Sequence, residues 1–385
     1  MKAGKKRFYS IAAAFIFSIC SLSALDWGGI IKNTSKVMLP NFLDFGLNQK
    51  DDLYFWMTTP LGNSNMFFSA EGLYEFGYYM DSSSNILSHA LDIDLFKLYG
   101  DFEFENSNTF SISLGRFLVS DASSVILAQN IDGLFLKYHT GFITASAFAG
   151  YTGLLNSQLI TMLDGEAYAY SYDRALYTLS NPYLPFNASL EFPALFGNQS
   201  LVFQLNGCLD FGEQKANRYY ATLWLTGPIT NMSFYNVSTI FGTKDFKNLM
   251  NYSSLDLYFY LSDIFFFSAG AEYASGKHGP FSPFVGITSR SIVASITAPE
   301  TSSSLLPKVS ATVILNNMSL AVIGKYYIAC PETSFDSQGV EMDFFLTYSI
   351  FSDFQIGLDV TSYFDVTSQK DNNNLTATLK FAVSF

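Results

Sequence analysis

Acidic side chains recur at alternate positions in several segments of this sequence, with apolar side chains at the positions between them. Carboxylates spaced in this way share one face of an extended chain, because successive side chains of a β-strand point to opposite faces. A wall of carboxylates around water could attract cations and repel anions. The candidate pore-lining residues, with one lysine among them, are Asp210, Glu272, Glu341, Asp343, Asp359 and Lys380.

Catalytic and metal-binding chemistry has little support in the sequence. The three histidines are His89, His139 and His278, and none lies at i, i+4 from another, the spacing of a helical metal site. The sequence contains no GxSxG, HExxH or CxxC motif. We therefore expect no enzyme, no metal site and no cofactor.

The segments that carry the acidic residues alternate between apolar and polar side chains with a period of two, which is typical of β-strands with one apolar face. The clearest segments are Leu201–Phe211, Val340–Ile350, Phe354–Val360 and Leu375–Phe385. Three of these four are 11 residues long. That length is about twice the usual strand of a soluble protein and is enough for a tilted strand to cross a bilayer.

The composition leaves two fold classes open. The chain is 49% hydrophobic and 17% aromatic but only 14% charged, whereas about a quarter of the residues of a soluble domain are charged. Beyond the N-terminus no run of about 18 apolar residues could form a spanning helix. A soluble all-β protein would also alternate, but strand length and aromatic clusters such as Phe265-Phe266-Phe267 favour a membrane barrel. We predict an all-β, transmembrane antiparallel up-and-down β-barrel of about 16–18 strands over residues 25–385.

Residues 1–24 have the three-part organisation of a cleaved signal peptide. Lys2, Lys5, Lys6 and Arg7 precede an apolar stretch, and small residues follow it. Cleavage would leave 17 basic against 33 acidic side chains, a balance that argues against nucleic acid as a partner. The remaining cysteines, Cys208 and Cys330, are expected to be unpaired thiols.

The chain ends in an amphipathic strand with a terminal aromatic residue, Phe381-Ala382-Val383-Ser384-Phe385. In this respect the sequence resembles bacterial outer-membrane β-barrel proteins. The resemblance implies an outer-membrane location, contact with lipid, and recognition of Phe385 by the barrel-assembly machinery. A second stretch, Gly115-Arg116-Phe117 followed by residues 130–134 (Asn-Ile-Asp-Gly-Leu), is similar to a pattern of several porin families.

The connections between the predicted strands are expected to alternate between short and long. The long ones, on the external side, include residues 34–50, 80–90, 118–130, 152–185 and 276–304, and a first strand is expected near Asp26–Lys32. A change of phase at Phe96-Lys97 predicts a β-bulge. In general porins one long loop folds into the channel, so the resemblance makes 152–185 the candidate constriction loop. Its charged residues are Asp164, Glu166, Asp173 and Arg174.

These features predict a channel for passive diffusion of small hydrophilic solutes, with a weak preference for cations and possible homo-oligomerisation. Two alternatives stay open. One is a transporter of hydrophobic compounds resembling the fatty-acid uptake (FadL-like) barrels, in which residues 33–50 would form an N-terminal plug. The other is a surface adhesin or structural barrel whose loops bind a host or matrix partner.

Overall fold

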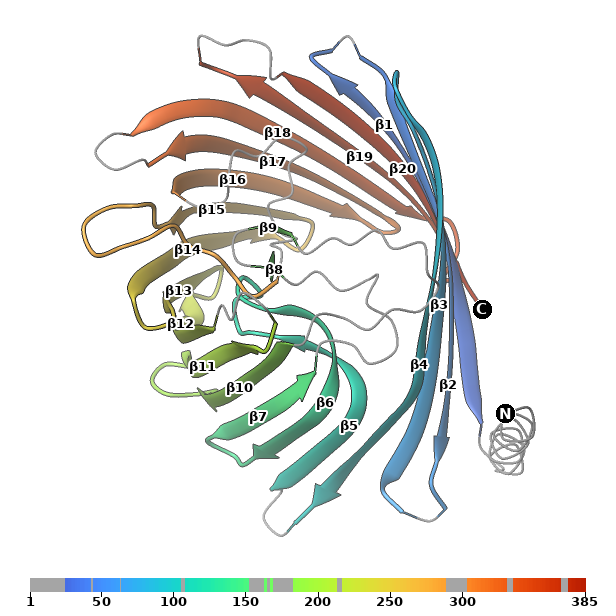
Figure 1. Ribbon diagram of the computed structural model, residues 1–385, viewed down its shortest axis with the longest axis vertical. Helices are drawn as coiled ribbons and strands as arrows, with labels where there is room; N and C mark the ends of the chain where they lie inside the picture. The colour runs from blue at the N-terminus through green and yellow to red at the C-terminus, as the bar shows by residue number, and fades with distance from the viewer. Residues whose placement is uncertain are drawn as a thin grey trace.

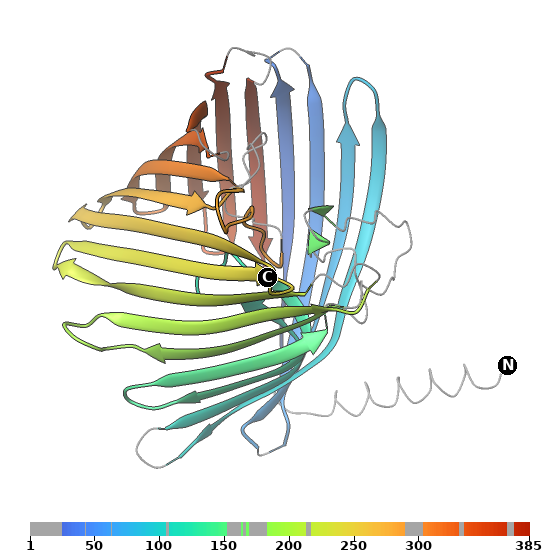
Figure 2. The ribbon, with the colours of Figure 1, turned by 60° about the vertical axis from the view of Figure 1, so that its left-hand side comes forward.

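The computed structural model is a single closed antiparallel β-barrel (Figures 1 and 2). The structure describes residues 25–42, 44–62, 64–104, 108–151, 163–164, 167–168, 183–212, 217–288, 303–330, 335–367 and 373–385. For residues 90, 92–96, 163–164 and 167–168 this description covers the main chain. Within these ranges no helix is long and apolar enough to cross a membrane.

In the part of the chain that the structure describes, eighteen strands form the wall, the upper end of the predicted range. Each pairs with its neighbours in chain order, and the predicted first strand is present. The strands are β1 (Asp26–Pro40), β2 (Gly46–Pro60), β3 (Met66–Met80), β4 (Asn85–Glu103), β5 (Thr109–Ser120), β6 (Ala128–His139), β7 (Thr144–Tyr151), β10 (Tyr183–Phe192), β11 (Ser200–Asp210), β12 (Arg218–Thr230), β13 (Ser233–Lys244), β14 (Asn248–Ser262), β15 (Phe265–Ala274), β16 (Ser304–Leu315), β17 (Met318–Ala329), β18 (Asp336–Ser349), β19 (Phe354–Asp365) and β20 (Asn374–Ser384). The short strands β8 (Leu163–Asp164) and β9 (Ala167–Tyr168) pair with each other in a separate two-stranded sheet that is not part of the wall.

The barrel closes where β1 pairs with β20. At the end of this seam Gly29 and Phe385 exchange both main-chain hydrogen bonds, each 3.0 Å from nitrogen to oxygen. A side chain at position 29 would collide with the Phe385 ring, because a Cβ built there lies 2.5 Å from Cζ of that ring. The seam therefore accommodates the terminal aromatic ring over a glycine.

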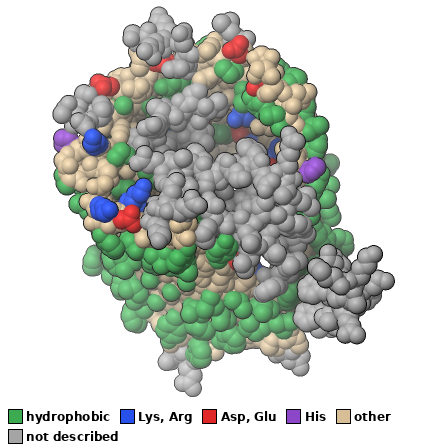
Figure 3. All heavy atoms as spheres, in the orientation of Figure 1, with side chains coloured by type: hydrophobic (Ala, Val, Ile, Leu, Met, Phe, Trp, Pro, Cys, Tyr) green, Lys and Arg blue, Asp and Glu red, His purple; other side chains and the backbone are tan. Residues whose placement is uncertain are grey.

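The outward face of the wall is apolar. Large side chains with more than a third of their surface exposed include Ile31, Leu53, Leu205, Leu255 and Val383. Figure 3 shows hydrophobic side chains gathered over the lower part of the barrel in that view. Aromatic pairs lie close to the turns at both ends of the barrel. Examples are Tyr260 with Phe266, beside the turn between β14 and β15, and Tyr219 with Phe246, at the turn between β13 and β14. This is the surface that a barrel in a bilayer requires.

Two of the predicted long loops are wrong. The segment 34–50 is the end of β1, a tight turn and the start of β2, and the turn uses the left-handed residues Asn41 and Phe42. The segment 80–90 is a turn over residues 81–84, in which the Asp81 carboxylate accepts hydrogen bonds from the main-chain nitrogens of Ser83 and Ser84. Because residues 33–50 belong to the wall and its turn, they do not form a plug.

The predicted β-bulge is confirmed. The register between β3 and β4 shifts between Ser69, which pairs with Lys97, and Glu71, which pairs with Asp94. One residue of β3 thus faces two of β4, and the alternation of β4 changes phase there.

Candidate channel lumen

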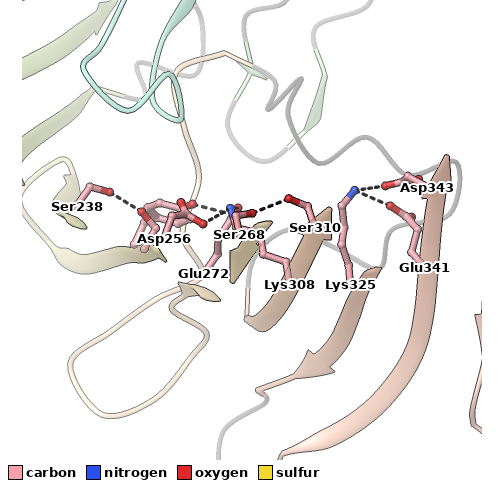
Figure 4. Close-up of polar contacts among 11 residues, drawn as sticks. Ser238, Asp256, Ser268, Glu272, Lys308, Ser310, Lys325, Glu341 and Asp343 are labelled. Carbon is pink, nitrogen blue, oxygen red and sulfur yellow. Dashed lines mark hydrogen bonds and ion pairs between the residues drawn. The ribbon is translucent and has the colours of Figure 1, made fainter. Parts of the chain in front are cut away.

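Charged side chains on the inner face of the wall form clusters of one lysine with carboxylates. In the first cluster, Lys308 of β16 lies 2.9 Å from Asp256 Oδ1 of β14 and 2.9 Å from Glu272 Oε1 of β15 (Figure 4). The Tyr252 hydroxyl donates a hydrogen bond of 2.8 Å to Glu272 Oε2. One ammonium group therefore stabilises two carboxylates from two different strands.

A glycine makes this geometry possible. Asp256, Gly270 and Lys308 are register partners on three successive strands, so they lie in one row across the wall. A Cβ built on Gly270 would lie 2.2 Å from Asp256 Oδ1. Because Gly270 has no side chain, Lys308 reaches across β15 to a carboxylate two strands away.

The second cluster is more deeply buried. Lys325 of β17 lies 2.7 Å from Glu341 Oε1 and 2.7 Å from Asp343 Oδ2, both on β18. The side chains of Glu341 and Asp343 are 1% and 4% exposed, and that of Lys325 is 13% exposed. Ion pairs this deeply buried leave the carboxylates dependent on the lysine.

The two clusters meet at a pair of lysines. Lys308 and Lys325 are direct register partners across β16 and β17. Like charges directly opposite each other are destabilising, but here each ammonium points to its own pair of carboxylates on the far side (Figure 4). Hydroxyl pairs continue the polar surface: Ser268 with Ser310 at 2.6 Å, and Ser238 of β13 with Ser254 at 2.8 Å.

Two further clusters extend the charged surface around the seam. Lys380 of β20 pairs with Asp359 of β19. On β2 and β3, Lys50 lies 2.7 Å from Glu75 and 3.6 Å from Asp52. In all four clusters the lysine side chain is more exposed than the carboxylates that it binds, for example 50% for Lys380 against 20% for Asp359.

Five of the six sequence-derived lumen residues thus lie in these clusters. Asp210 does not: it lies at the end of β11, where its main-chain nitrogen and Oδ1 bond to Asn217 and Gly212. The sequence analysis did not select Lys50, Asp52, Glu75 or Lys308. Lys308 could have been found, because it alternates with Ser310 and Thr312 on the polar face of β16.

Among the described residues, two connections fold inward and cover the opposite wall. The Asp121 carboxylate organises the first, residues 121–127: its oxygens accept hydrogen bonds from the main-chain nitrogens of Ser123, Ile126 and Leu127. Burial raises the pKa of Asp121, while these hydrogen bonds act in the opposite direction. The side chains of Ile126 and Leu127 are completely buried, so this loop is a packed part of the barrel interior.

The second connection contributes residues 282–288, which we call the inner strap. The main-chain nitrogens of Ile287 and Thr288 donate to the Ile126 carbonyl oxygen at 2.7 and 3.0 Å. From the wall, Arg218 Nη1 donates to the Gly286 carbonyl at 2.8 Å and the Tyr220 hydroxyl donates to the Val285 carbonyl at 2.6 Å. The strap is therefore attached both to the loop and to β12.

An apolar cluster fills the space between these connections and the wall. It joins Phe284 and Ile287 of the inner strap to side chains from β5 through β15. The wall side chains of this cluster include Phe117, Ile131, Phe148, Tyr183, Cys208, Tyr220, Ile240, Met250 and Tyr252. This half of the lumen is packed like a protein core.

The predicted constriction loop lies almost entirely outside the described residues. Glu166, Asp173 and Arg174 are not described, and Asp164 is described only as main chain of β8. The sequence analysis missed the inward folding of residues 121–127 and 282–288. A possible signal is the apolar run Val125-Ile126-Leu127 inside a connection, since water would not favour it there.

The porin-like motif brings two charges together. Arg116 and Asp132 are register partners on β5 and β6, and two guanidinium nitrogens each lie 2.8 Å from one carboxylate oxygen. The Arg116 side chain is 5% exposed. Bidentate pairs of this kind fix orientation as well as charge.

Cys208 and Cys330 are both free thiols, as predicted.

The fold is similar to that of solved structures, although no protein-family model matches the sequence and no curated protein matches it. Pseudomonas aeruginosa OccK1 (OpdK) has a TM-score of 0.64 at 11% identity, with 94% of this chain and 99% of that chain covered. Pseudomonas aeruginosa OccK5 (OpdH) has 0.63 at 10% identity, covering 94% and 98%. Pseudomonas aeruginosa OpdQ has 0.62 at 12% identity, covering 94% and 99%.

OpdK is an outer membrane protein. At these identities the likeness is one of fold. At that level the predicted fold, an all-β closed antiparallel barrel, is confirmed.

Proposed function

We propose that this protein is a porin-like outer-membrane channel through which small hydrophilic solutes diffuse passively. The observation that carries the proposal is the set of lysine–carboxylate clusters on the inner face of a closed 18-stranded barrel with an apolar outer face. Charged groups on the inner face need water, and a barrel of this size can hold it.

The charges of the four clusters support a weak preference for cations. They contain seven carboxylates and four ammonium groups, a net charge of −3. The carboxylates attract cations, but the more exposed lysines reduce this attraction at the surface that a solute meets. The preference is therefore expected to be weak.

The inward connections would set the size limit. Residues 121–127 and the inner strap occupy one half of the lumen and leave the charged wall of β14–β20 as the solute path. The charged residues of the 152–185 loop stay predicted constriction residues. OpdK has been crystallised with vanillate, and this supports small organic solutes as a class for the present chain.

Export and assembly complete the proposal. Residues 1–24 would be cleaved at export, and the strand that ends in Phe385 would be recognised by the barrel-assembly machinery. The N-terminal sequence of the protein isolated from membranes tests the first point, since it should begin near Leu25. Association of copies in the membrane is a separate possibility that cross-linking can test.

Conductance in a planar lipid bilayer tests the channel. The refolded mature chain should give reproducible open steps in KCl, and a salt gradient should give a small reversal potential of the sign that favours K⁺. A well-folded barrel that stays silent would contradict the channel and support an adhesin or structural barrel. A reversal potential that favours Cl⁻ would contradict only the charge preference.

A further inference from the structure

The two adjoining clusters of Lys308 and Lys325 present charges of both signs to the lumen. An ammonium group has three protons to donate, and each of these two donates to two carboxylates. Among the described residues no further group accepts a hydrogen bond from the third N–H of either ammonium group. Both ammonium groups can therefore donate one further hydrogen bond to a solute.

The carboxylates lie behind the ammonium groups but outnumber them. The lysine side chains are 26% and 13% exposed, and the four carboxylates range from 1% to 13%. The pair of clusters has two positive and four negative groups. A solute thus meets ammonium groups first, within a region whose net charge is negative.

We propose that this double cluster favours zwitterionic solutes that carry one carboxylate and one primary ammonium, such as small amino acids. The proposal rests on the proposed channel function and names its solute class. The solute carboxylate accepts one hydrogen bond from the third N–H of Lys308 and one from that of Lys325. The solute ammonium lies near the carboxylates beyond them, Asp256 and Glu272 on one side or Glu341 and Asp343 on the other.

Solutes with a single charge fit this surface less well. An anion accepts hydrogen bonds from the lysines but is repelled by the net negative charge of the region. A cation is attracted by that charge but meets the two lysines at the surface. A zwitterion satisfies both signs and adds no net charge to the lumen, so it avoids both penalties.

Osmotic swelling of liposomes that contain the refolded protein tests the proposal. The two probes are 4-aminobutyrate, a zwitterion, and 4-hydroxybutyramide, an uncharged molecule of similar size, and neither creates a diffusion potential. For the wild-type channel 4-aminobutyrate should enter about tenfold faster, because tenfold corresponds to about 1.4 kcal/mol, roughly the contribution of one hydrogen bond to a charged group. Equal rates for the two probes would overturn the proposal.

The matched variant removes the charges and keeps the approximate sizes of the side chains. It combines Lys308→Met, Asp256→Asn and Glu272→Gln with Lys325→Met, Glu341→Gln and Asp343→Asn, so that no carboxylate is left buried without its lysine. Its 4-aminobutyrate rate should fall to that of 4-hydroxybutyramide. The control, Lys247→Met in the external turn after β13, should keep the wild-type ratio. An unchanged ratio in the six-residue variant would overturn the proposal.

Conductance in KCl separates this proposal from the channel itself. No conductance and no swelling with any solute would remove the proposed function. Normal conductance without a preference for 4-aminobutyrate would remove only the zwitterion proposal. Zero-current potentials with potassium butyrate and butylammonium chloride complete the test, and a butylammonium permeability above that of K⁺ would overturn it in favour of a simple cation channel.

Discussion

The inner face of this barrel is built differently on its two sides. From β5 to β13, and at Met250, Tyr252 and Ala274 of β14 and β15, its side chains are packed in an apolar cluster beneath residues 121–127 and the inner strap. From β14 to β20 it carries lysines and carboxylates in ion pairs. Both sides follow the same alternation along their strands. Alternation therefore decides which side chains point inward, but the chain that covers them decides whether that face is dry or wet.

Tyr252 lies where the two sides meet. Its ring packs against Phe284 of the inner strap, with ring centroids 5.5 Å apart, and its hydroxyl bonds to Glu272 of the first charged cluster. The apolar packing and the charged clusters are therefore in direct contact, and a change on one side can reach the other. The following variants test how independent the two sides are.

The largest effect is expected from removing Lys325. Lys325→Met leaves Glu341 and Asp343 buried without their counter-ion, and breaking a buried pair in this way costs about 3–5 kcal/mol. Urea unfolding in detergent micelles should show this loss, and the triple variant that adds Glu341→Gln and Asp343→Asn should recover most of it. A loss below about 1 kcal/mol would indicate that these groups are solvated like surface ion pairs.

On the covered side, removing the two hydrogen bonds that attach the inner strap to β12 should lower stability less than Lys325→Met does. It should change the conductance more. The double variant Arg218→Met, Tyr220→Phe removes the donors to the Gly286 and Val285 carbonyls. The buried Gly286 carbonyl left unpaired costs about 1–3 kcal/mol, and the part-buried Val285 carbonyl costs less because water can reach it. The strap should loosen from β12 while its bonds to Ile126 remain, and the single-channel conductance should rise. Tyr235→Phe, which removes a hydroxyl bonded to Gln199, serves as the control. Unchanged conductance would show that the strap does not narrow the path.

A substitution at Gly270 tests the geometry of the first charged cluster. In Gly270→Val the new side chain meets Asp256 and separates it from Lys308, with an expected loss of about 1–3 kcal/mol from overpacking. The reversal potential should change as well, because Asp256 loses its counter-ion. Gly324→Val is the matched control: a Cβ there meets nothing closer than 3.4 Å, and the cost should be smaller.

The smallest effect is expected at the exposed pair near the seam. Lys380 is half exposed, so water screens its attraction to Asp359, and Lys380→Met should cost below about 1 kcal/mol. The same unfolding assay used for Lys325→Met gives the comparison directly. A cost as large as that of Lys325→Met would mean that burial does not explain the difference between the clusters.

The sequence predicts the wall of the barrel well, because a period of two is a property of each strand alone. It fails at residues 34–50, where polar side chains occupy the outward face as well. Asn33, Ser35, Gln49 and Asp51 lie there and hydrogen-bond to one another, with Asn33 Nδ2 2.5 Å from Asp51 Oδ1. The alternation that marks a strand is hidden in that stretch.

The lumen could be predicted only in part. Strand phase assigns the carboxylates of β15 and β18 and the lysines of β16 and β17 to the inner face, but which lysine binds which carboxylate depends on register between strands, and alternation does not specify register. The inner strap depends on contacts between residues more than 150 positions apart, such as Ile126 with Ile287. No local pattern carries such information.

The seam between β1 and β20 implies an order in which the pairs of strands form during folding. Every other pair of neighbouring strands in the wall except β7 and β10, and β15 and β16, is joined by a short connection and can pair early, as in a hairpin. The seam joins residues such as Asn33 and Phe381, almost the whole chain apart, and contacts of such separation form slowly. Until they form, the sheet has two open edges that can pair with any other extended chain. The barrel is therefore most vulnerable to aggregation just before its last pair of strands meets.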